Sequence, residues 1–326
     1  MRIGVVGAGA WGTALAQVAG CEGEEVLIWA LEREVAEAIN SRHENSLFLP
    51  GLSLSPGVRA TNDLADLAQC EAFLIVAPAQ HLRKVAAAVP AAGKPLVLCA
   101  KGIEDGTGLL MHEVAREVQP DSPIAVLSGP TFAHEVAAGL PTAVTLAAED
   151  QGLGERLIAR IARPFFRPYH SPDIAGAEVG GAVKNVLAIA CGVVEGRRLG
   201  LNARSALISR GFAEMTRFGL AKGARPETLA GLAGLGDLVL TCSSTSSRNF
   251  SLGKGIGEGA RAAELLADRR TVAEGAFTAP VLKRAADTLG VDMPIVGAVC
   301  ALLAGEASVD EVVERLLARP LRSEGV

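Results

Sequence analysis

The feature that most constrains this chain is the glycine pattern Gly7-Ala8-Gly9-Ala10-Trp11-Gly12, which directly follows an apolar segment at residues 2–6. A helical pattern then runs through residue 19. In this order, G-x-G-x-x-G is typical of the first strand, turn and helix of a dinucleotide-binding fold, because glycine permits the tight turn and the helix start offers N–H groups to a pyrophosphate. We therefore expect Gly7, Gly9, Ala10 and Gly12 to contact a cofactor, the alternative being a simple glycine-rich turn.

Two residues after the second expected strand (residues 25–30) indicate different cofactors. Glu32 lies about 20 positions after Gly12, where an acid that binds the ribose of NAD is expected. Arg33 is suited instead to the 2′-phosphate of NADP. Either residue is equally compatible with a solvated first helical turn. The sequence therefore predicts NAD or NADP without a preference between them.

Three further apolar segments, at residues 72–77, 95–100 and 123–127, alternate with helical patterns at 79–89 and 109–118. This spacing predicts parallel strands whose carboxyl ends share one edge of a sheet, where ligands of open α/β sheets bind. Lys101 and the turn 128–131 would lie at that edge. Segments 142–147 and 164–169 are expected to extend the sheet, with another strand direction.

From about residue 172 the strand patterns stop and helical patterns follow, at residues 176–196, 203–221, 226–233, 260–267, 278–289, 294–304 and 308–318. Strands first and helices afterwards indicate two domains. The fold class predicted is thus α/β, with a Rossmann-type dinucleotide-binding domain over residues 1–175 and an all-α, substrate-binding domain over residues 176–326.

Lys184 stands in otherwise apolar company within the first of these helical patterns, and steps of three and four place Leu187, Ala188 and Cys191 on its face. A lysine held there loses water, so its pKa falls unless a carboxylate stands nearby. The alternative is a stem that lies along an apolar groove with its ammonium group in water. We expect this helix to pack against the ligand-binding edge of the first domain.

Asp237 lies in a glycine-rich, apolar stretch at residues 234–242, where a buried carboxylate requires a partner. Lys184 is the candidate partner. The serine-rich residues 243–249 are either a flexible linker or, with Arg248 and Asn249, a donor set that binds phosphate. Residues 271–278 are predicted to form a loop before a helix that Pro280 helps to start.

Composition excludes several classes of function. With 49% hydrophobic and 21% charged residues the chain is globular, and a net charge of −5 without a basic run disfavours nucleic acid or an anionic membrane as partner. No apolar run approaches the roughly 20 residues that span a bilayer, the best being 295–304. The chain enters a strand at once, so no signal peptide is expected. Six cysteines without CxxC favour a reducing cytoplasm, and five histidines show no metal-ligand spacing.

Taken together, six segments resemble the bacterial-type NAD(P)-dependent glycerol-3-phosphate dehydrogenases, in order and spacing over nearly the whole chain. They are GAGAWGTALA, AKGIE, SGPTFAHEVAAGLPT, GGAVKN, AGLGDLVLTC with SSRN, and VAEG. The resemblance implies a cytoplasmic homodimer that reduces dihydroxyacetone phosphate to sn-glycerol 3-phosphate for phospholipid synthesis.

The same resemblance implies the roles of individual residues. Lys184 would exchange the proton at the carbonyl, with Asp237 orienting it. The substrate would contact Lys101, Gly129, Thr131, Lys184, Asp237, Ser247, Arg248 and Asn249. The cofactor would contact Trp11, Arg33, Lys101, Ala133, Arg248, Val272 and Glu274. The chain departs from the family after its second strand. Many members carry a basic residue directly after the Trp-x pair, whereas here Leu31 and Glu32 come first and Arg33 follows them.

Two other functions remain open at this stage. A related hydroxyacid dehydrogenase would also join a Rossmann domain to helices and use a lysine, but its substrate would carry a carboxylate in place of the phosphate. A cofactor-sensing protein on the same fold would bind NADH without oxidising it, because a fold alone does not determine function. A sensor needs no proton donor, so the combination of Lys184, Asp237 and Arg248 favours an enzyme.

Overall fold

The computed structural model describes residues 1–267 and 273–320, and these form two compact units. The first unit comprises residues 1–101 and 109–174, and the second comprises residues 102–108 and the chain from residue 175 onward. Residues 102–108 are predicted to lie in the first domain. They belong instead to the second unit, because Lys222 donates a 3.3 Å hydrogen bond to the Gly108 carbonyl and Arg284 pairs with Asp105.

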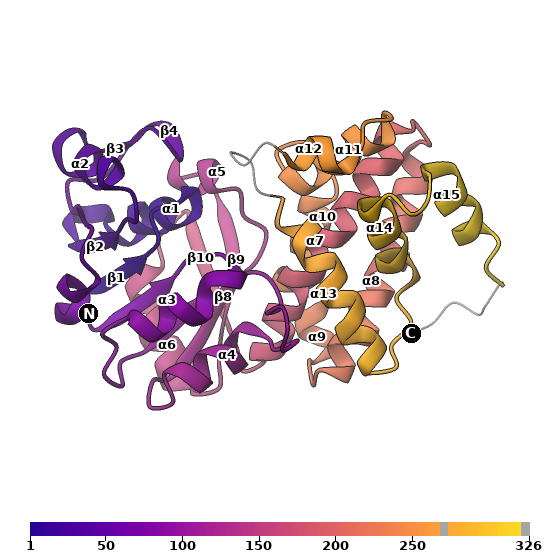
Figure 1. Cartoon of the computed structure of the whole chain (residues 1–326). Coiled ribbons are helices and arrows are strands. Elements are labelled where there is room, and N and C mark those ends of the chain that lie inside the picture. The colour runs from indigo at the N-terminus through magenta and orange to yellow at the C-terminus, as the bar shows by residue number, and fades with distance from the viewer. Residues whose placement is uncertain (268–272, 321–326) are drawn as a thin grey trace. The chain divides into compact units, whose positions relative to one another are not determined.

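The first unit is built on an eight-stranded sheet in the order β10-β9-β8-β7-β6-β1-β2-β5 (Figure 1). Strands β1, β2, β6, β7 and β8 are parallel, as predicted, and β5, which was not predicted, pairs parallel with β2. Strand β9 pairs antiparallel with β8. Strand β10 runs parallel to β9, so the last two strands do extend the sheet in the other direction. The strands are β1 (Ile3–Val6), β2 (Val26–Trp29), β5 (Val58–Thr61), β6 (Ala72–Ile75), β7 (Leu96–Leu98), β8 (Ile124–Ser128), β9 (Thr142–Ala148) and β10 (Phe166–Ser171).

Three strands of this unit have no counterpart in the sequence analysis. Strand β5 is short and alternates buried with exposed residues, so it lacks the continuous apolar run that marks its neighbours. Strands β3 (Glu44–Asn45) and β4 (Leu49–Ser53) form a separate antiparallel pair after the second helix, and most of their residues are exposed or only partly buried. Propensity alone cannot reveal such elements, because their pairing partners define them.

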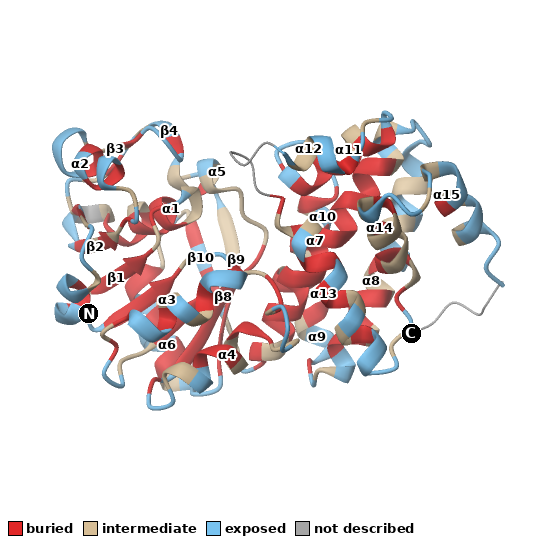
Figure 2. Cartoon of the chain, in the orientation of Figure 1, coloured by how far each residue is buried: buried red, intermediate tan, exposed pale blue. Residues whose placement is uncertain are grey.

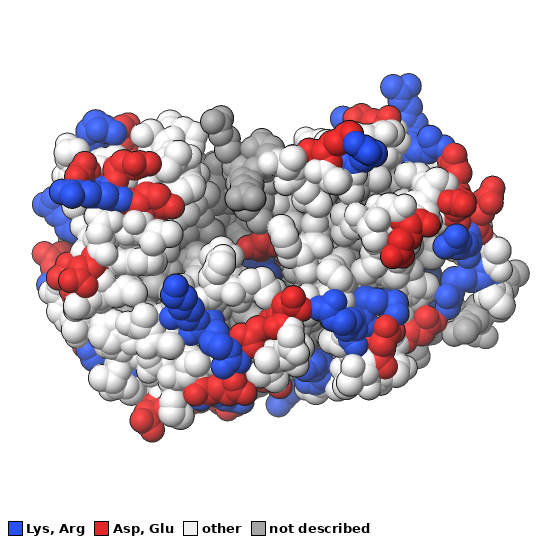
Figure 3. All heavy atoms as spheres, in the orientation of Figure 1, with Lys and Arg blue, Asp and Glu red and all other residues white. Residues whose placement is uncertain are grey.

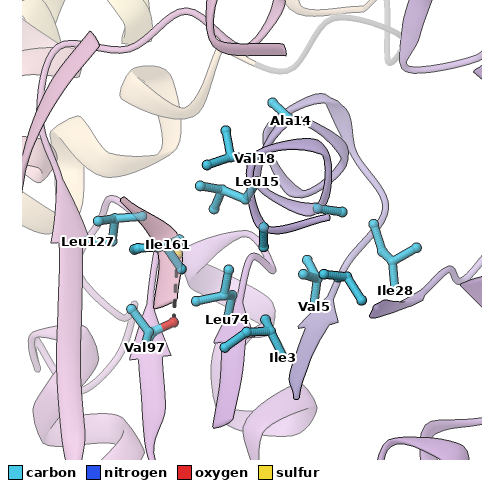
Figure 4. Packing of buried hydrophobic residues seen from close by; sticks show 14 of the residues in the cluster. Ile3, Val5, Ala14, Leu15, Val18, Ile28, Leu74, Val97, Leu127 and Ile161 are labelled. Atoms are coloured by element: carbon cyan, nitrogen blue, oxygen red, sulfur yellow. Dashed lines mark hydrogen bonds between the residues drawn. The ribbon is translucent and has the colours of Figure 1, made fainter. Parts of the chain in front are cut away.

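Helices cover the sheet of the first unit, and α1 packs directly on its parallel strands. Figure 4 shows Leu15 and Val18 of α1 lying over Val5 and Leu74, all of them at most 2% exposed. This packing removes apolar surface from water and holds the turn before α1 in place. The helices are α1 (Ala10–Ala19), α2 (Arg33–Arg42), α3 (Leu82–Ala88), α4 (Met111–Val118), α5 (Ala133–Ala137) and α6 (Gln151–Ile161), with 3₁₀ turns at Cys21–Gly23, Leu64–Gln69 and Ala79–His81.

In the described part of the second unit all regular elements are helical, which confirms the predicted fold class. The helices are α7 (Ile174–Gly196), α8 (Leu201–Ala221), α9 (Pro226–Leu229), α10 (Asp237–Thr241), α11 (Arg248–Gly257), α12 (Ala262–Leu266), α13 (Glu274–Thr288), α14 (Pro294–Ala304) and α15 (Val309–Leu317), with a π-helical turn at Leu232–Gly236 before α10. Helix α7 is the core of this unit and is buried along most of its length (Figure 2).

Helix α7 corrects one statement of the sequence analysis. Its 23 residues have a mean hydropathy of 1.5 over the best 18-residue window, so it is long and apolar enough to cross a membrane by length and composition. Of that window, 94% is buried inside the structure. The expectation that no apolar run approaches spanning length was therefore wrong, because the few charged residues of the helix do not offset its many alanines and valines. Burial explains the composition, since a core helix must be apolar on all sides.

Two helix starts also differ from expectation. Helix α13 begins at Glu274, and Pro280 lies inside it instead of near its start. The helix continues past the proline because Gly275, Thr278 and Ala279 are buried before it and Val281 and Leu282 after it, and this packing outweighs the one backbone hydrogen bond that proline lacks. Helix α11, which begins at Arg248, was not predicted at all, because the glycines within it weaken the helical pattern.

Candidate active site

The glycine loop of the first unit is closed toward its own backbone and open on its other side. Gly7 has a φ of +115°, a conformation that favours glycine, and a Cβ added to Gly12 would lie 1.8 Å from the Gly7 carbonyl oxygen. In contrast, a Cβ added to Gly9 would meet no atom of the described residues within 4 Å. The loop therefore leaves space for a ligand at Gly9 while its two flanking glycines allow the close packing beneath.

The start of α1 has the properties of an anion site. Within the described residues, no side chain caps the start of α1, whose N-cap residue is Gly9, and the first turn of the helix holds no acidic residue. The backbone N–H groups there, at the positive end of the helix dipole, suit a phosphate. The indole Nε1 of Trp11 is buried and has no hydrogen-bond partner among the described residues. A buried donor of this kind is normally satisfied, so a ligand is a natural partner for it. These features fit a dinucleotide.

The residues after β2 lie at the surface. Glu32 is the residue before α2, and Arg33 is its first residue. The Arg33 side chain is 86% exposed, and its Nε lies 3.0 Å from the carboxylate of Glu37 one turn later. An exposed ion pair of this kind is weak, so the guanidinium can leave it for another anion.

Lys101, Gly129 and Thr131 come together at the carboxyl ends of β7 and β8. The Lys101 Nζ donates to the Gly129 carbonyl at 3.1 Å, and the Thr131 hydroxyl donates to the same oxygen at 3.3 Å. Gly129 has a φ of +150°, and a Cβ there would lie 3.0 Å from the Cα of Val144. Ala133 begins α5 shortly after this turn. The predicted convergence of these residues at one sheet edge is thus present in the first unit.

In the second unit, Lys184 of α7 forms a buried ion pair with Asp237 of α10. The Lys184 Nζ lies 2.5 Å from Asp237 Oδ1, and the two side chains are 8% and 0% exposed. The pairing inferred from the sequence is therefore present, and the lysine does not extend into water. Burying two charges costs several kcal/mol per ion before their attraction is counted, so such a pair is a poor means of gaining stability.

Thr241 is a residue at this site that the sequence analysis missed. Its hydroxyl lies 2.6 Å from the Asp237 carbonyl oxygen, to which it donates, and 3.3 Å from the Asp237 carboxylate. One turn of α10 separates Thr241 from Asp237, so the spacing of four residues was the available signal. The hydroxyl therefore lies beside the carboxylate that pairs with Lys184.

A network of amides next to the ion pair joins three helices. Asn249 of α11 donates to the side-chain oxygen of Asn185 on α7 at 3.0 Å. The carboxamide oxygen of Asn249 accepts the backbone N–H of Gly275, at the start of α13, at 2.8 Å. Asn185 follows Lys184 directly, and adjacency to the lysine was the only sequence signal for it. The network places the beginnings of α11 and α13 beside α7.

The remaining predicted residues surround the start of α11 and α13. The buried Ser247 caps α11, since its hydroxyl accepts the Phe250 N–H at 3.2 Å, and Arg248 is exposed at the first position of that helix. The linker interpretation of residues 243–249 therefore fails at its carboxyl end. Glu274 is the first residue of α13. Val272 lies outside the described residues.

Cysteine chemistry does not suit this site. Burial raises the pKa of the Cys242 thiol well above its usual value, and the neighbouring Cys191 raises it further. A thiol that stays protonated is a poor nucleophile. The Lys184 ammonium is therefore a better candidate than the Cys242 thiol for the group that donates a proton at this site.

A parallel sheet with a glycine-rich first turn, together with a helical unit that holds a buried lysine–aspartate pair, defines the class of dinucleotide-dependent dehydrogenases. Family models match both halves of the chain, namely "NAD-dependent glycerol-3-phosphate dehydrogenase N-terminus" over residues 2–153 and "NAD-dependent glycerol-3-phosphate dehydrogenase C-terminus" over residues 173–314. The chain belongs to the NAD-dependent glycerol-3-phosphate dehydrogenase family.

Individual relatives agree with this membership. A "Glycerol-3-phosphate dehydrogenase [NAD(P)+]" from Novosphingobium aromaticivorans is 66% identical over 326 residues, covering 99% of this chain and 98% of the relative. Its counterpart from Caulobacter vibrioides is 57% identical with the same coverage. The crystal structure of glycerol-3-phosphate dehydrogenase from Coxiella burnetii, 37% identical, superposes with a TM-score of 0.92 and covers 98% of this chain and 99% of its own.

Proposed function

We propose that this protein catalyses the reversible, NAD(P)-dependent reduction of dihydroxyacetone phosphate to sn-glycerol 3-phosphate, for phospholipid synthesis. Family membership over both halves of the chain and full-length relatives of that printed name support the activity. The single observation that carries it is the buried Lys184–Asp237 pair. A ketone needs a proton on oxygen as well as a hydride on carbon, and an ammonium held by a carboxylate is such a proton donor.

The first unit holds the cofactor in this proposal. When bound, the nicotinamide supplies the hydride. The glycine turn and the start of α1 bind the pyrophosphate of the dinucleotide. The buried indole N–H of Trp11 donates a hydrogen bond to the same cofactor. The cofactor residues proposed are Gly7, Gly9, Ala10, Trp11, Gly12, Arg33, Lys101, Ala133, Arg248, Val272 and Glu274. The exposed guanidinium of Arg33 serves a 2′-phosphate, while Glu32 beside it suits a ribose hydroxyl, so both NAD and NADP remain candidates.

The triose phosphate contacts Lys184, Asp237 and the residues around them. The Lys184 ammonium polarises the carbonyl and donates its proton to the oxygen; in the reverse direction the neutral amine accepts the proton of the alcohol. Asp237 orients the ammonium and stabilises its charge. Arg248, Asn249 and Ser247 bind the phosphate, so binding energy far from the reacting carbon positions it. Lys101, Gly129 and Thr131 complete the substrate contacts.

Nicotinamide absorbance tests the activity. Purified full-length protein is mixed with dihydroxyacetone phosphate and, in parallel, NADH or NADPH. Oxidation of either cofactor supports the proposal. Oxidation only with 3-oxo acids would instead identify a hydroxyacid dehydrogenase. The fold of this chain is also similar to that of D-mandelate dehydrogenase, at 13% identity and a TM-score of 0.64. NADH binding without oxidation by any of these substrates would identify a sensor.

Arg248→Ala tests the phosphate contact. Loss of a charge-assisted bond of about 1.5–3 kcal/mol should raise the KM for dihydroxyacetone phosphate by about tenfold or more while kcat changes less. Arg261→Ala is the matched control, because Arg261 lies just before α12 and pairs with Glu264 at the surface. A kcat effect in Arg248→Ala with an unchanged KM would contradict the phosphate assignment.

We further propose a cytoplasmic homodimer, as the family resemblance implies. Light scattering of the purified protein should then give twice the 33.5 kDa mass of the chain. A mass of one chain at micromolar concentration would contradict the dimer without affecting the proposed reaction.

A further inference from the structure

Asn45 is a buried asparagine outside the residues considered so far, and it belongs to the small β3–β4 arm of the first unit. The arm begins where α2 ends, at His43, whose φ of 53° turns the chain, and it closes with a 2.7 Å bond from the Leu54 N–H to the His43 carbonyl. Asn45 is only 1% exposed although most of the arm is accessible. Its side chain therefore points inward, away from water.

The Asn45 carboxamide bonds to the glycine loop on one side and to its own arm on the other. Its Nδ2 donates to the Ala8 carbonyl oxygen at 2.8 Å and to the Thr13 hydroxyl oxygen at 2.8 Å. Its Oδ1 accepts the Phe48 N–H at 3.1 Å. Thr13, which is fully buried on α1, also directs its hydroxyl to the Ala8 carbonyl at 3.3 Å. The Ala8 carbonyl thus meets side-chain donors from both Asn45 and Thr13.

These bonds determine how the peptide between Ala8 and Gly9 is oriented. In a trans peptide the C=O and the N–H point in opposite directions. When Asn45 and Thr13 hold the Ala8 oxygen toward the interior, the Gly9 N–H is directed away from it, at a residue where an added Cβ would meet no described atom within 4 Å. Gly9 is also the N-cap residue of α1, and its carbonyl accepts the Thr13 N–H at 2.9 Å.

We propose that Asn45 is a positioning residue for the cofactor: it holds the Ala8–Gly9 peptide so that the glycine loop presents its N–H groups to the dinucleotide pyrophosphate. This inference rests on the proposed function. Asn45 does not touch the cofactor; it acts through the Ala8 carbonyl. Preorganised N–H donors bind a phosphate without the cost of first being ordered.

Asn40 is a matched control in the same unit. Its Nδ2 donates to the Ala60 carbonyl at 2.8 Å and its Oδ1 accepts the Ala60 N–H at 2.9 Å, which joins α2 to β5. It therefore makes strong side-chain bonds to backbone, as Asn45 does, but away from the glycine loop. Each asparagine bonds to backbone groups through both polar atoms of its side chain, but Asn40 is exposed whereas Asn45 is buried. Of the two, it is Asn45 that contacts Ala8.

The test uses full-length Asn45→Asp, Asn40→Asp and the unmodified protein. Asn45→Asp keeps the acceptor for Phe48 and replaces the donor to Ala8 with a carboxyl oxygen. We expect its NADH dissociation constant, measured by fluorescence, to rise about tenfold or more, because the Ala8 carbonyl loses its Asn45 donor and faces a carboxyl oxygen instead. The KM for dihydroxyacetone phosphate and kcat at saturating NADH should change by less than about threefold. Asn40→Asp should lower the melting temperature and leave NADH affinity within about twofold.

Thr13→Val provides a second variant in case Asn45→Asp does not fold. It removes the other donor to Ala8 at nearly constant volume, and NADH affinity should fall by about threefold to tenfold. Unchanged NADH affinity in the variants that fold, or an equal loss in Asn40→Asp, would overturn the role of Asn45. If the unmodified protein itself fails to bind NADH and NADPH, the proposed function fails instead, so the two failures are distinguishable.

Discussion

At the scale of single residues, the charged pair in the second unit is better explained by chemistry than by stability. Lys184 and Asp237 are both nearly inaccessible to solvent. Replacing such a pair with apolar residues is often neutral or stabilising, whereas removing one partner leaves an uncompensated charge. A chain with no use for the pair would gain little by keeping it in the buried core of the second unit.

Lys184→Ala should lower kcat by about 10²–10⁴-fold, the usual contribution of a general acid. It should also lower the melting temperature, because Asp237 then lacks its counter-ion. Lys184→Arg separates the two effects, since a guanidinium keeps the charge but does not release its proton. Steady-state kinetics and thermal unfolding of both variants provide the check. Near-normal turnover in Lys184→Ala would require its catalytic role to be withdrawn.

Glu214 predicts a pH dependence of stability in the second unit. Burial raises its pKa to about 7, although its carboxylate accepts the N–H groups of Ile295 and Val296, at 2.7 and 3.2 Å, at the start of α14. A carboxyl whose pKa is raised on folding contributes stability below its unfolded value of 4.5, and this contribution is lost as the pH rises through about 7.

The free energy of unfolding of the unmodified protein should therefore decline by roughly 3 kcal/mol between about pH 4.5 and pH 7. Glu214→Gln should remove this decline, because glutamine does not titrate. Denaturant titrations at several pH values measure it, with the exposed Glu227→Gln as control. The same pH slope in Glu214→Gln as in the unmodified protein would show that Glu214 titrates near its ordinary value.

At the scale of elements, helices α7 and α11 approach so closely that their backbones touch. A Cβ added to Gly253 would lie 1.9 Å from the Ile189 carbonyl oxygen, and one added to Gly192 would lie 2.1 Å from that of Phe250. This contact explains how a glycine-rich segment of low helical propensity forms α11, because packing against α7 offsets the propensity. It also positions Arg248 and Asn249 at the start of α11.

Gly253→Ala should destabilise the protein by about 1–3 kcal/mol or more, because the added methyl group forces the two backbones apart. Gly297→Ala, inside α14, is the matched control. There the nearest atom is the Lys283 Cε at 3.5 Å, so alanine should stabilise by about 0.5–1 kcal/mol through its higher helical propensity. Chemical denaturation of both variants measures the difference, and equal effects would contradict the close contact.

At the scale of the whole molecule, surface charge is mixed. On the face drawn in Figure 3, Lys and Arg side chains lie among Asp and Glu side chains. Ion pairs of the described residues include Arg83–Glu117 at 2.7 Å. Because charges of opposite sign lie close together, their electrostatic potentials partly cancel at the surface. Specific anion binding then requires a site formed by particular residues. In this chain the proposed sites are the start of α1 and the start of α11.

Binding of the dinucleotide should stabilise the protein as a whole. NADH at about 100 times its dissociation constant adds about 2.7 kcal/mol to the free energy of unfolding of the part that binds it. Thermal unfolding of the full chain with NADH, NADPH and free nicotinamide checks this. The preferred dinucleotide should give the larger shift at equal concentration, while nicotinamide alone should give none. An equal shift with nicotinamide would argue against pyrophosphate binding at the glycine loop.

The sequence by itself determined most of the parallel strands, the glycine turn before α1 and most of the long helices, because hydrophobic periodicity and glycine conformation are local properties. It did not determine β5, the β3–β4 arm or α11, which form because of the elements that pack on them. The need of a buried carboxylate for a partner also predicted that Lys184 and Asp237, 53 residues apart, would meet. The tertiary structure alone decided the contact between Asn45 and Ala8, which are 37 residues apart. Such contacts depend on how helices and strands pack, which no local pattern encodes.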